Sequence, residues 1–185
     1  MAHKENDPQG KNEANRMGII VVRRHATPCG ELILGSYGDK LCLCDWALSV
    51  RRAQNKTSLM RNLNATMEEG ETETIRRAIV ALDEYFAGQM QTFDIPTLIV
   101  GTEFQRKAWA ALLTIPYGET RSYGEMAHAV GSPRGARAVA QAIGANRLSI
   151  IIPCHRVVGA DNALTGYAGG IEAKKTLLRL ENSLR

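Results

Sequence analysis

The feature that most constrains this chain of 185 residues is the stretch at residues 150–158, Ile-Ile-Ile-Pro-Cys-His-Arg-Val-Val. Three β-branched isoleucines predict a short buried strand, and Pro153 should end it because proline has no N–H to donate to a neighbouring strand. Cys154 then stands at the end of a hydrophobic element, directly before His155 and Arg156. A thiolate is a strong nucleophile, and nearby cations or hydrogen bonds lower the pKa of a thiol. This order of residues therefore favours a reactive Cys154 over a structural one.

Positive charge is concentrated in the second half of the chain. Residues 101–185 hold 11 Lys and Arg against 6 Asp and Glu, a net charge of +5, whereas residues 1–100 hold 12 against 13, a net charge of −1. This asymmetry indicates a polyanionic partner for the second half. No apolar run approaches the roughly 20 residues that cross a bilayer, and the N-terminus lacks the apolar core of a signal peptide. We therefore expect a cytoplasmic protein, nuclear if the source is eukaryotic, with no membrane partner.

The four cysteines do not have the spacing of a secreted disulfide framework, so we expect free thiols in a reducing compartment. Zinc is an alternative for Cys29, Cys42 and Cys44 together with the nearby His25. Cys42 and Cys44 alternate with leucines, however, as buried strand residues do, and no Cys-x-x-Cys pair supports a metal site. The sequence therefore predicts no metal.

The first hundred residues predict a scaffold lobe. Residues 1–16 are polar without a hydrophobic period, which is typical of a disordered tail. Three runs predict the strands of a small antiparallel sheet, at residues 18–24, 31–37 and 40–46. The polar residues 51–70 predict a loop, and the spacing of apolar side chains in residues 71–87 predicts one amphipathic helix. We assign residues 17–90 to this lobe, in which we find no catalytic constellation, and residues 91–100 to a linker.

Residues 101–185 predict a mainly helical domain. Thr102 can cap a first helix, on which Phe104, Ala108, Trp109 and Leu112 form one apolar face. Later in the domain, residues 161–170 form a glycine-rich loop that either approaches a ligand or simply connects two elements. A last helix over residues 171–184 carries Glu181 near its end.

Two short helices between these elements predict a helix-turn-helix. Ser122 with Glu125 three residues on matches the capping box of one helix, and a turn leads into another helix over residues 134–145. The second helix is rich in small residues and carries Arg134 and Arg137. Such a helix can lie close to a DNA duplex, although an ordinary antiparallel helix pair is the alternative.

The run Pro153 to Val157 resembles the active-site signature of the O-6-alkylguanine-DNA alkyltransferases, also called methylated-DNA–protein-cysteine methyltransferases. The resemblance extends over residues 101–181 and more faintly through the first half. It implies an α/β (α+β) fold, with a ribonuclease H-like N-terminal lobe of a small antiparallel sheet plus helix. The C-terminal domain would be a winged helix-turn-helix with short strands.

The resemblance also implies a function. The protein would flip an O-6-alkylated guanine out of double-stranded DNA and transfer the alkyl group irreversibly to Cys154. Because a thioether is not hydrolysed at useful rates, each chain would act once, without a cofactor. We expect a monomer whose partner is duplex DNA that contains the alkylated base.

Catalytic roles follow from the same resemblance, residue by residue. Cys154 is similar to the nucleophile, and His155 to a base that acts on it through a bound water. Glu181, 27 residues after Cys154, is similar to the carboxylate that orients this base. Asn146 is similar to an asparagine that braces the active-site turn. Tyr123 is similar to a tyrosine that helps rotate the 3′ phosphate and hydrogen-bonds the guanine ring.

Binding roles come from the resemblance as well. Arg137 is similar to an arginine that enters the duplex in place of the flipped nucleotide. The remaining DNA contacts would come from the helix pair, through Ser122, Tyr123, Arg134, Ala136 and Gln141. The alkylguanine pocket would consist of Ile143, Val157, Tyr167, Ala168 and Gly169. Some relatives carry serine in place of Ala168, so the range of accepted alkyl groups can differ here, and we expect Arg156 to be structural through hydrogen bonds to carbonyl groups.

Three other functions are open at this stage. A thiol hydrolase would use Cys154 and His155 directly, although adjacent residues at a strand end point in different directions. A non-catalytic protein that binds alkylated DNA would share the helix pair, but such relatives replace the cysteine. A transcription regulator with a cysteine sensor is the third.

Overall fold

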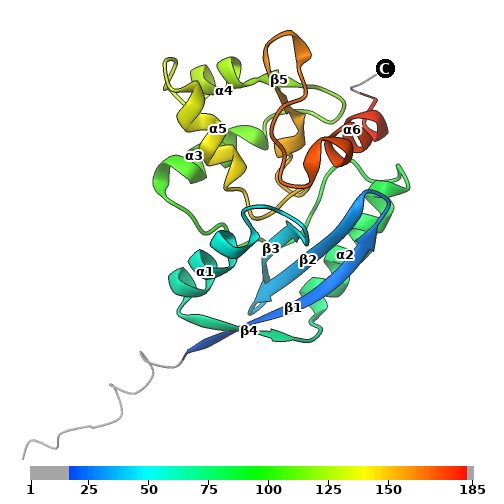
Figure 1. Cartoon of the computed structure of the whole chain (residues 1–185). Helices are drawn as coiled ribbons and strands as arrows, with labels where there is room; N and C mark the ends of the chain where they lie inside the picture. Colours follow the sequence, from blue (N-terminus) through cyan, green and yellow to red (C-terminus); the bar gives the residue numbers. More distant parts are fainter. Residues whose placement is uncertain (1–16, 183–185) are drawn as a thin grey trace, which may run out of the picture.

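The structure is a computed structural model that describes residues 17–182, so the predicted tail at residues 1–16 and the end of the helix predicted for residues 171–184 lie outside the described residues. It confirms a mixed α+β chain, with a small sheet in the N-terminal half and helices in the C-terminal half (Figure 1). Within residues 17–182, no helix is both long and apolar enough to cross a membrane.

The N-terminal lobe contains a four-stranded sheet with the order β3-β2-β1-β4. As predicted, three strands pair antiparallel: β1 (Gly18–Thr27), β2 (Gly30–Tyr37) and β3 (Lys40–Trp46). The fourth strand, β4 (Ala65–Glu69), pairs parallel to β1 and was not predicted. A bulge between Gly35 and Ser36 interrupts the register of β2 and β3.

The loop predicted for residues 51–70 is wrong, because this segment forms α1 (Arg52–Leu63) and β4. Only Asn55 and Leu59 of α1 are buried, so the helix has almost no apolar period for sequence analysis to detect. The helix is stabilised by packing against the sheet, where Leu59 joins a second hydrophobic cluster, rather than by the intrinsic helix propensity of its residues. Asn64 ends the helix in the left-handed conformation, with φ of 46°.

The helix predicted for residues 71–87 is confirmed as α2 (Glu73–Phe86), which lies behind the sheet in Figure 1. Thr72 caps it, since its side chain accepts a hydrogen bond from the Ile75 N–H at 3.2 Å. The buried face of the helix includes Leu82 and, one turn later, the fully buried Tyr85.

The C-terminal lobe follows the predicted order of helices: α3 (Glu103–Leu112), α4 (Tyr123–Ala129), α5 (Ala136–Gly144) and α6 (Gly170–Leu180). Thr102 and Ser122 form the two capping boxes that start α3 and α4. Three residues of the apolar face predicted for α3 are buried. The prediction that Phe104 belongs to this face is wrong, because its side chain lies at the surface. Two short parallel strands, β5 (Arg121–Ser122) and β6 (Val157–Val158), accompany the helices.

The strand predicted for residues 150–152 is wrong, although its three isoleucines are buried. The backbone turns here, and Ile150 has a φ of 71°, which a β-branched residue rarely adopts. Hydrogen bonds from the Ile152 N–H to Leu148 O (2.7 Å) and from the Cys154 N–H to Ile152 O (2.8 Å) hold the turn. Cys154 therefore begins a single 3-10 turn, η2 (Cys154–Arg156), rather than ending a strand.

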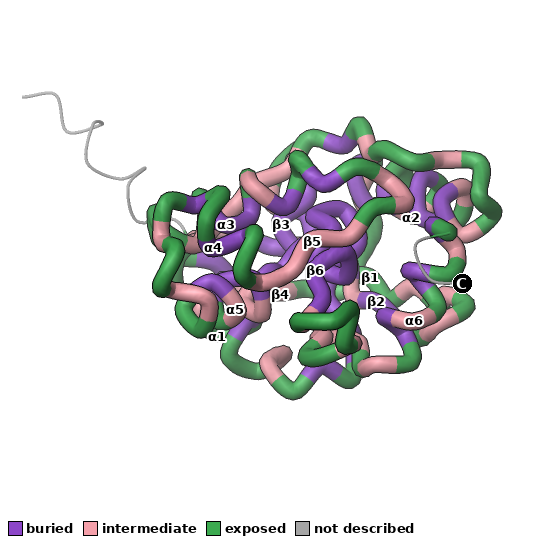
Figure 2. The backbone as a smooth tube through the Cα atoms, turned by 90° about the horizontal axis from the view of Figure 1, so that it is seen from above, coloured by how far each residue is buried: buried purple, intermediate pink, exposed green. Residues whose placement is uncertain are grey.

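The two lobes share one hydrophobic core. Its buried residues come from β2, β3 and α2 on one side and from α3 to α6 on the other. Cys44 of β3 also exchanges backbone hydrogen bonds with the segment before the turn: its N–H donates to Arg147 O, and its carbonyl accepts from the Ser149 N–H, both at 2.7 Å. Buried residues consequently run through the middle of the molecule in Figure 2, while α4 and α5 lie at its edge.

Candidate active site

Cys154 lies at the inner end of a cavity of about 560 Å³. The residue is 7% exposed, and the cavity continues from it past Ile143 and Ala140 to Arg137 on α5. The sulfur therefore has a route to the face of the molecule that carries the predicted helix-turn-helix. A sulfur sealed inside the core would have excluded chemistry at this residue.

Asn146 braces the turn around Cys154, as the sequence analysis predicted. Its side-chain amide donates to Ile152 O at 2.9 Å and to the Cys154 Sγ at 3.3 Å, and its oxygen accepts from the Leu148 N–H at 2.9 Å. The expectation of a lowered thiol pKa is wrong for the protein without DNA. Burial raises the pKa of Cys154 to about 11, and the Asn146 hydrogen bond and the nearby Lys174 offset only part of that effect. The thiol therefore holds its proton at neutral pH.

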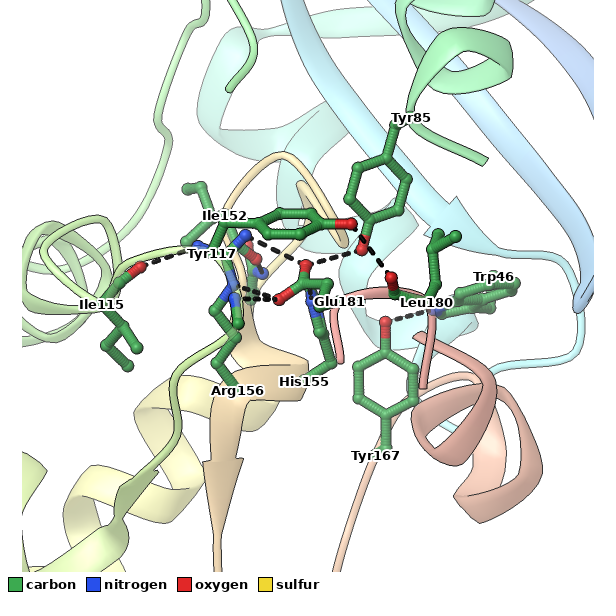
Figure 3. Close-up of polar contacts among 12 residues, drawn as sticks. Trp46, Tyr85, Ile115, Tyr117, Ile152, His155, Arg156, Tyr167, Leu180 and Glu181 are labelled. Atoms are coloured by element: carbon green, nitrogen blue, oxygen red, sulfur yellow. Dashed lines mark hydrogen bonds and ion pairs between the residues drawn. The ribbon is translucent and has the colours of Figure 1, made fainter. Parts of the chain in front are cut away.

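His155 is fully buried and turns its ring toward Glu181, with 2.8 Å between Nε2 and Oε1 (Figure 3). Burial lowers the pKa of His155 more than its hydrogen bond to Glu181 raises it, so the ring is neutral at neutral pH. Since an ionised carboxylate only accepts, Nε2 must carry the proton, and Nδ1 is left with a free lone pair. Nδ1 is buried and has no hydrogen-bond partner among the described residues. It is the basic atom that this site offers.

Glu181 is buried at the end of α6 rather than solvated (Figure 3). Burial raises its pKa, but hydrogen bonds from His155 and Arg156 outweigh that effect and lower the pKa to about 2. Arg156 Nε donates to Oε2 at 2.8 Å and Nη2 to Oε1 at 3.0 Å, while Nη1 donates to Ile115 O at 2.7 Å. The prediction that Arg156 bonds a carbonyl group is confirmed, whereas its ion pair with Glu181 was not predicted.

The cavity is lined by three of the five predicted pocket residues, Ile143, Tyr167 and Ala168, and by Tyr123. Val157 and Gly169 lie outside the lining. Val157 is fully buried in β6, and a Cβ atom at Gly169 would come within 2.5 Å of the Trp46 indole. Gly169 thus allows Trp46 to approach the loop closely, and the Trp46 Nε1 donates to the Tyr167 hydroxyl at 3.2 Å (Figure 3).

Comparison with known proteins agrees with this geometry. The sequence model of the "6-O-methylguanine DNA methyltransferase, DNA binding domain" matches residues 103–183. The methylated-DNA–protein-cysteine methyltransferase of Mycobacterium tuberculosis is 50% identical over 171 residues, which cover 89% of this chain and 94% of the relative. A constitutive protein of the same name from Bacillus subtilis is 43% identical over 164 residues, with 84% and 91% covered. This chain belongs to the methylated-DNA–protein-cysteine methyltransferase family.

Solved structures support the same conclusion. The crystal structure of Mycobacterium tuberculosis OGT in complex with DNA has a TM-score of 0.75 at 43% identity, covering 88% of this chain and 93% of that one. The O6-methylguanine-DNA methyltransferase of the archaeon Pyrococcus kodakaraensis, at 22% identity and a TM-score of 0.63, is similar in fold.

In this family member, the helix-turn-helix consists of α4 and α5. Arg134, Arg137 and Gln141 are exposed, and Ala136 and Arg137 line the mouth of the cavity. Ser122 is committed to capping α4, since its hydroxyl accepts from the Glu125 N–H at 3.1 Å. Of the predicted DNA-contacting residues, Tyr123, Ala136 and Arg137 thus line the cavity. Gln141 lies further along α5, and Arg134 lies in the turn before it.

Sequence analysis missed the part of the site that the N-terminal lobe supplies. Tyr85 of α2 donates to Glu181 Oε1 at 2.7 Å, Trp46 of β3 holds Tyr167, and Val50 and Arg51 line the cavity. Only Tyr85 had a detectable signal, because helical spacing places it on the buried face of α2, where a phenol needs a partner. The other contacts depend on how the lobes pack.

Among residues 17–182, no three His, Cys, Asp or Glu side chains gather as metal ligands. Cys42 and Cys44 are buried in β3, and the Cys42 thiol donates to Gly35 O. His25 instead pairs with Asp83, with 2.9 Å between Nε2 and Oδ1.

Proposed function

We propose that this protein repairs DNA by transferring an alkyl group from the O6 atom of guanine to Cys154, once per chain. The observation that carries the proposal is the single cavity that joins Cys154 to the exposed face of α5. The nucleophile can thus be reached from the surface that is suited to a DNA groove, and the next residue, His155, is a neutral histidine paired with a fixed carboxylate.

DNA binding would begin on α4 and α5. The small residues of α5, among them Ala136, let its backbone lie close to the duplex, and Arg134 and Gln141 can contact the strand nearby. An alkylated base inside the stack is out of reach of Cys154, so the nucleotide must rotate out of the duplex. This costs a few kcal/mol, which the Arg137 side chain can offset by filling the vacated space.

The chemistry would be a displacement at the saturated carbon of the alkyl group. The Cys154 sulfur forms a bond to that carbon while the bond from carbon to the guanine O6 breaks. The thiol proton leaves toward Nδ1 of His155 through a water, and a proton reaches the guanine ring, so that neutral guanine and a thioether result. Glu181 stabilises the imidazolium that forms for a moment, because its pKa of about 2 keeps it ionised.

Pocket residues would hold the flipped base beside the sulfur. Tyr123 starts α4 at the cavity, where its hydroxyl can donate to the guanine ring as negative charge develops, and it can steer the 3′ phosphate. Tyr167 and Ala168 would form the wall around the alkyl group, with Val157 and Gly169 supporting it from behind. Since the sulfur is consumed and no metal or coenzyme is required, we propose that the protein needs no cofactor. We further propose that it acts as a cytoplasmic monomer.

Intact-protein mass spectrometry tests the proposal. After incubation with excess duplex that contains O6-methylguanine, each chain should gain the mass of one CH₂ unit, located on the peptide with Cys154, and no more on longer incubation. Cys154→Ser should gain nothing. Cys44→Ser changes a buried cysteine that is not part of the cavity lining and should react like the wild type. Repeated turnover by one chain, or methylation of Cys154→Ser, would contradict the proposal.

The geometry does not favour a thiol hydrolase. Such an enzyme needs a hydrogen bond between cysteine and histidine, whereas the Cys154 sulfur accepts from Asn146 and the His155 Nε2 bonds Glu181. A non-catalytic DNA-binding role would leave Cys154 and its proton acceptor without a purpose.

A further inference from the structure

The loop between β3 and α1, at residues 47–51, exposes an aliphatic side chain at every second position. Leu48 is 96% exposed and Val50 is 95% exposed. Ala47, before Leu48, and Ser49, between the two, are each only 7% exposed. Single exposed apolar residues are common on protein surfaces. Two on alternate positions of one short loop, with their neighbours turned inward, form a small apolar surface.

Backbone hydrogen bonds hold this loop in place. The Ala47 N–H donates to Glu31 O (2.8 Å), the Ser49 N–H to Trp46 O (3.1 Å) and the Arg52 N–H to Ser49 O (3.1 Å). The Arg52 guanidinium also donates to Ala47 O at 3.1 Å. A loop that is fixed in this way exposes Leu48 and Val50 permanently, so a partner that binds there loses little free energy in ordering it.

The loop reaches the cavity that contains Cys154. Val50 and Arg51 both line it, although they belong to the N-terminal lobe. A side chain at Gly144, the last residue of α5, would meet Arg51 Nε at 3.8 Å. Arg137 lies near the opposite end of the same helix, and seven residues of helix correspond to about 10 Å. Two guanidinium groups therefore stand at the two ends of α5 beside one entrance.

We infer that residues 48–51 form a second DNA-contacting surface, in which Arg51 binds a backbone phosphate of the damaged strand and Val50 packs on the sugar of the flipped nucleotide. This inference rests on the proposed function. A nucleotide that enters this cavity carries a backbone phosphate on each side, and the Arg51 guanidinium at the entrance can pair with one of them, while Arg137 fills the vacated space in the duplex. Within residues 17–182, Arg51 forms no salt bridge that would compete for its guanidinium.

Arg51→Ala tests the phosphate contact, with Arg61→Ala as the charge-matched control on the exposed surface of α1. In anisotropy titrations against duplex DNA with O6-methylguanine, Arg51→Ala should raise the Kd about 5- to 10-fold. It should also lower the slope of log K against log salt by about 1, because one phosphate contact is lost. Arg51→Lys should restore the slope. Equal Kd and slope for Arg51→Ala and Arg61→Ala would overturn the inference.

A second variant, Leu48→Ser with Val50→Ser, tests the apolar contact without a folding problem, since both side chains are exposed. It should weaken duplex binding about 3-fold or more and leave the oligomeric state unchanged. If DNA affinity is unchanged and a wild-type dimer is lost instead, the loop binds a second copy and the inference is wrong.

Transfer from a free O6-alkylguanine base separates this inference from the proposed function. The free base has no phosphate, so Arg51→Ala should slow transfer from duplex DNA at least about 5-fold more than transfer from the base. A wild-type protein that transfers no alkyl group from either substrate would overturn both proposals. A wild-type protein that transfers from both, with Arg51→Ala equally slow on both, would overturn the phosphate contact alone.

Discussion

Within residues 17–182, each lobe buries one carboxylate, and the pKa values of the two carboxylates are shifted in opposite directions. Asp45, on β3 of the N-terminal lobe, accepts from the Trp46 N–H and from the Asn55 amide, both at 2.9 Å. These donors are neutral, and burial raises the pKa of Asp45 despite them. Glu181, in the C-terminal lobe, accepts from Arg156, His155 and Tyr85, and its pKa falls to about 2.

The difference lies in the donors rather than in the depth of burial, since Asp45 is 2% exposed and Glu181 is 1% exposed. A buried carboxylate stays ionised at low pH only when a cation and several hydrogen bonds replace its lost hydration. Asp45 forms no direct ion pair among the described residues and its pKa is raised, so its charge is a cost to folding. Glu181 has a fixed charge, which is what the proposed proton transfer at His155 requires.

Glu181→Gln should have the largest effect on this comparison. It leaves the Arg156 guanidinium buried without a counter-charge, so the free energy of unfolding should fall by about 3–5 kcal/mol in urea denaturation at pH 7. Asp45→Asn is the matched variant in the other lobe. It removes a charge that burial already disfavours and should change stability by less than about 1 kcal/mol. Equal losses in the two variants would show that the carboxylates do not differ as described.

Acid titration should give the next largest effect, with opposite signs for the two groups. Because the pKa of Glu181 is lowered from an ordinary 4.5 to about 2, its charge stabilises the fold above pH 4.5, by about 3 kcal/mol, and this is lost as the pH falls toward 2. The raised pKa of Asp45 acts the other way, since stability falls as the pH rises through its titration. Urea midpoints from pH 2.5 to 6 should therefore show a steep acid limb in the wild type and in Asp45→Asn, but a shallow one in Glu181→Gln.

Tyr85→Phe should have the smallest effect of the three, because it removes one neutral donor and leaves Arg156 and His155 on Glu181. We expect a loss of about 1.5–3 kcal/mol, typical of a hydrogen bond to a charged group. Tyr117→Phe is the control. The Tyr117 hydroxyl is nearby but donates to the Leu180 carbonyl group at 3.1 Å and not to the carboxylate. If the Tyr117 variant loses as much stability as the Tyr85 variant, the N-terminal lobe does not support Glu181 specifically.

Sequence analysis predicted the elements whose local signals agree with the packing. Thr102 and Ser122 have the right residues three positions later and do form capping boxes. Residues 51–70 lacked such a signal, because α1 presents only Asn55 and Leu59 to the interior. The three isoleucines at residues 150–152 gave a misleading local signal, because they favour a strand. Their burial was predicted correctly, but hydrogen bonds of the turn, not the strand propensity of β-branched residues, decide the backbone there.

For the active site, the chain pattern pointed to Cys154 and the family resemblance added His155 and Glu181, but neither predicted their protonation states. Neighbouring cationic residues favoured a low pKa for the Cys154 thiol, whereas its burial, which is a property of the folded protein, raises that pKa. Arg156 is two residues after Cys154 in the sequence, but in the folded protein its guanidinium donates hydrogen bonds to Glu181 instead. The contributions of Trp46, Val50 and Arg51 required the packing of two lobes, and no pattern within either half contains that information.

The bond between Tyr85 and Glu181 belongs to both halves of the polypeptide, as does the shared core. The exposed residues around Gly88 and Gln89 join the halves outside that interface. A protease that cut there would break one covalent link and leave the interface untouched, so the two fragments should remain together as a reactive complex. The C-terminal fragment made by itself would instead expose an apolar surface and an incompletely coordinated carboxylate. The segment that most resembles the family, residues 101–181, is therefore only one of two halves that fold around a shared core.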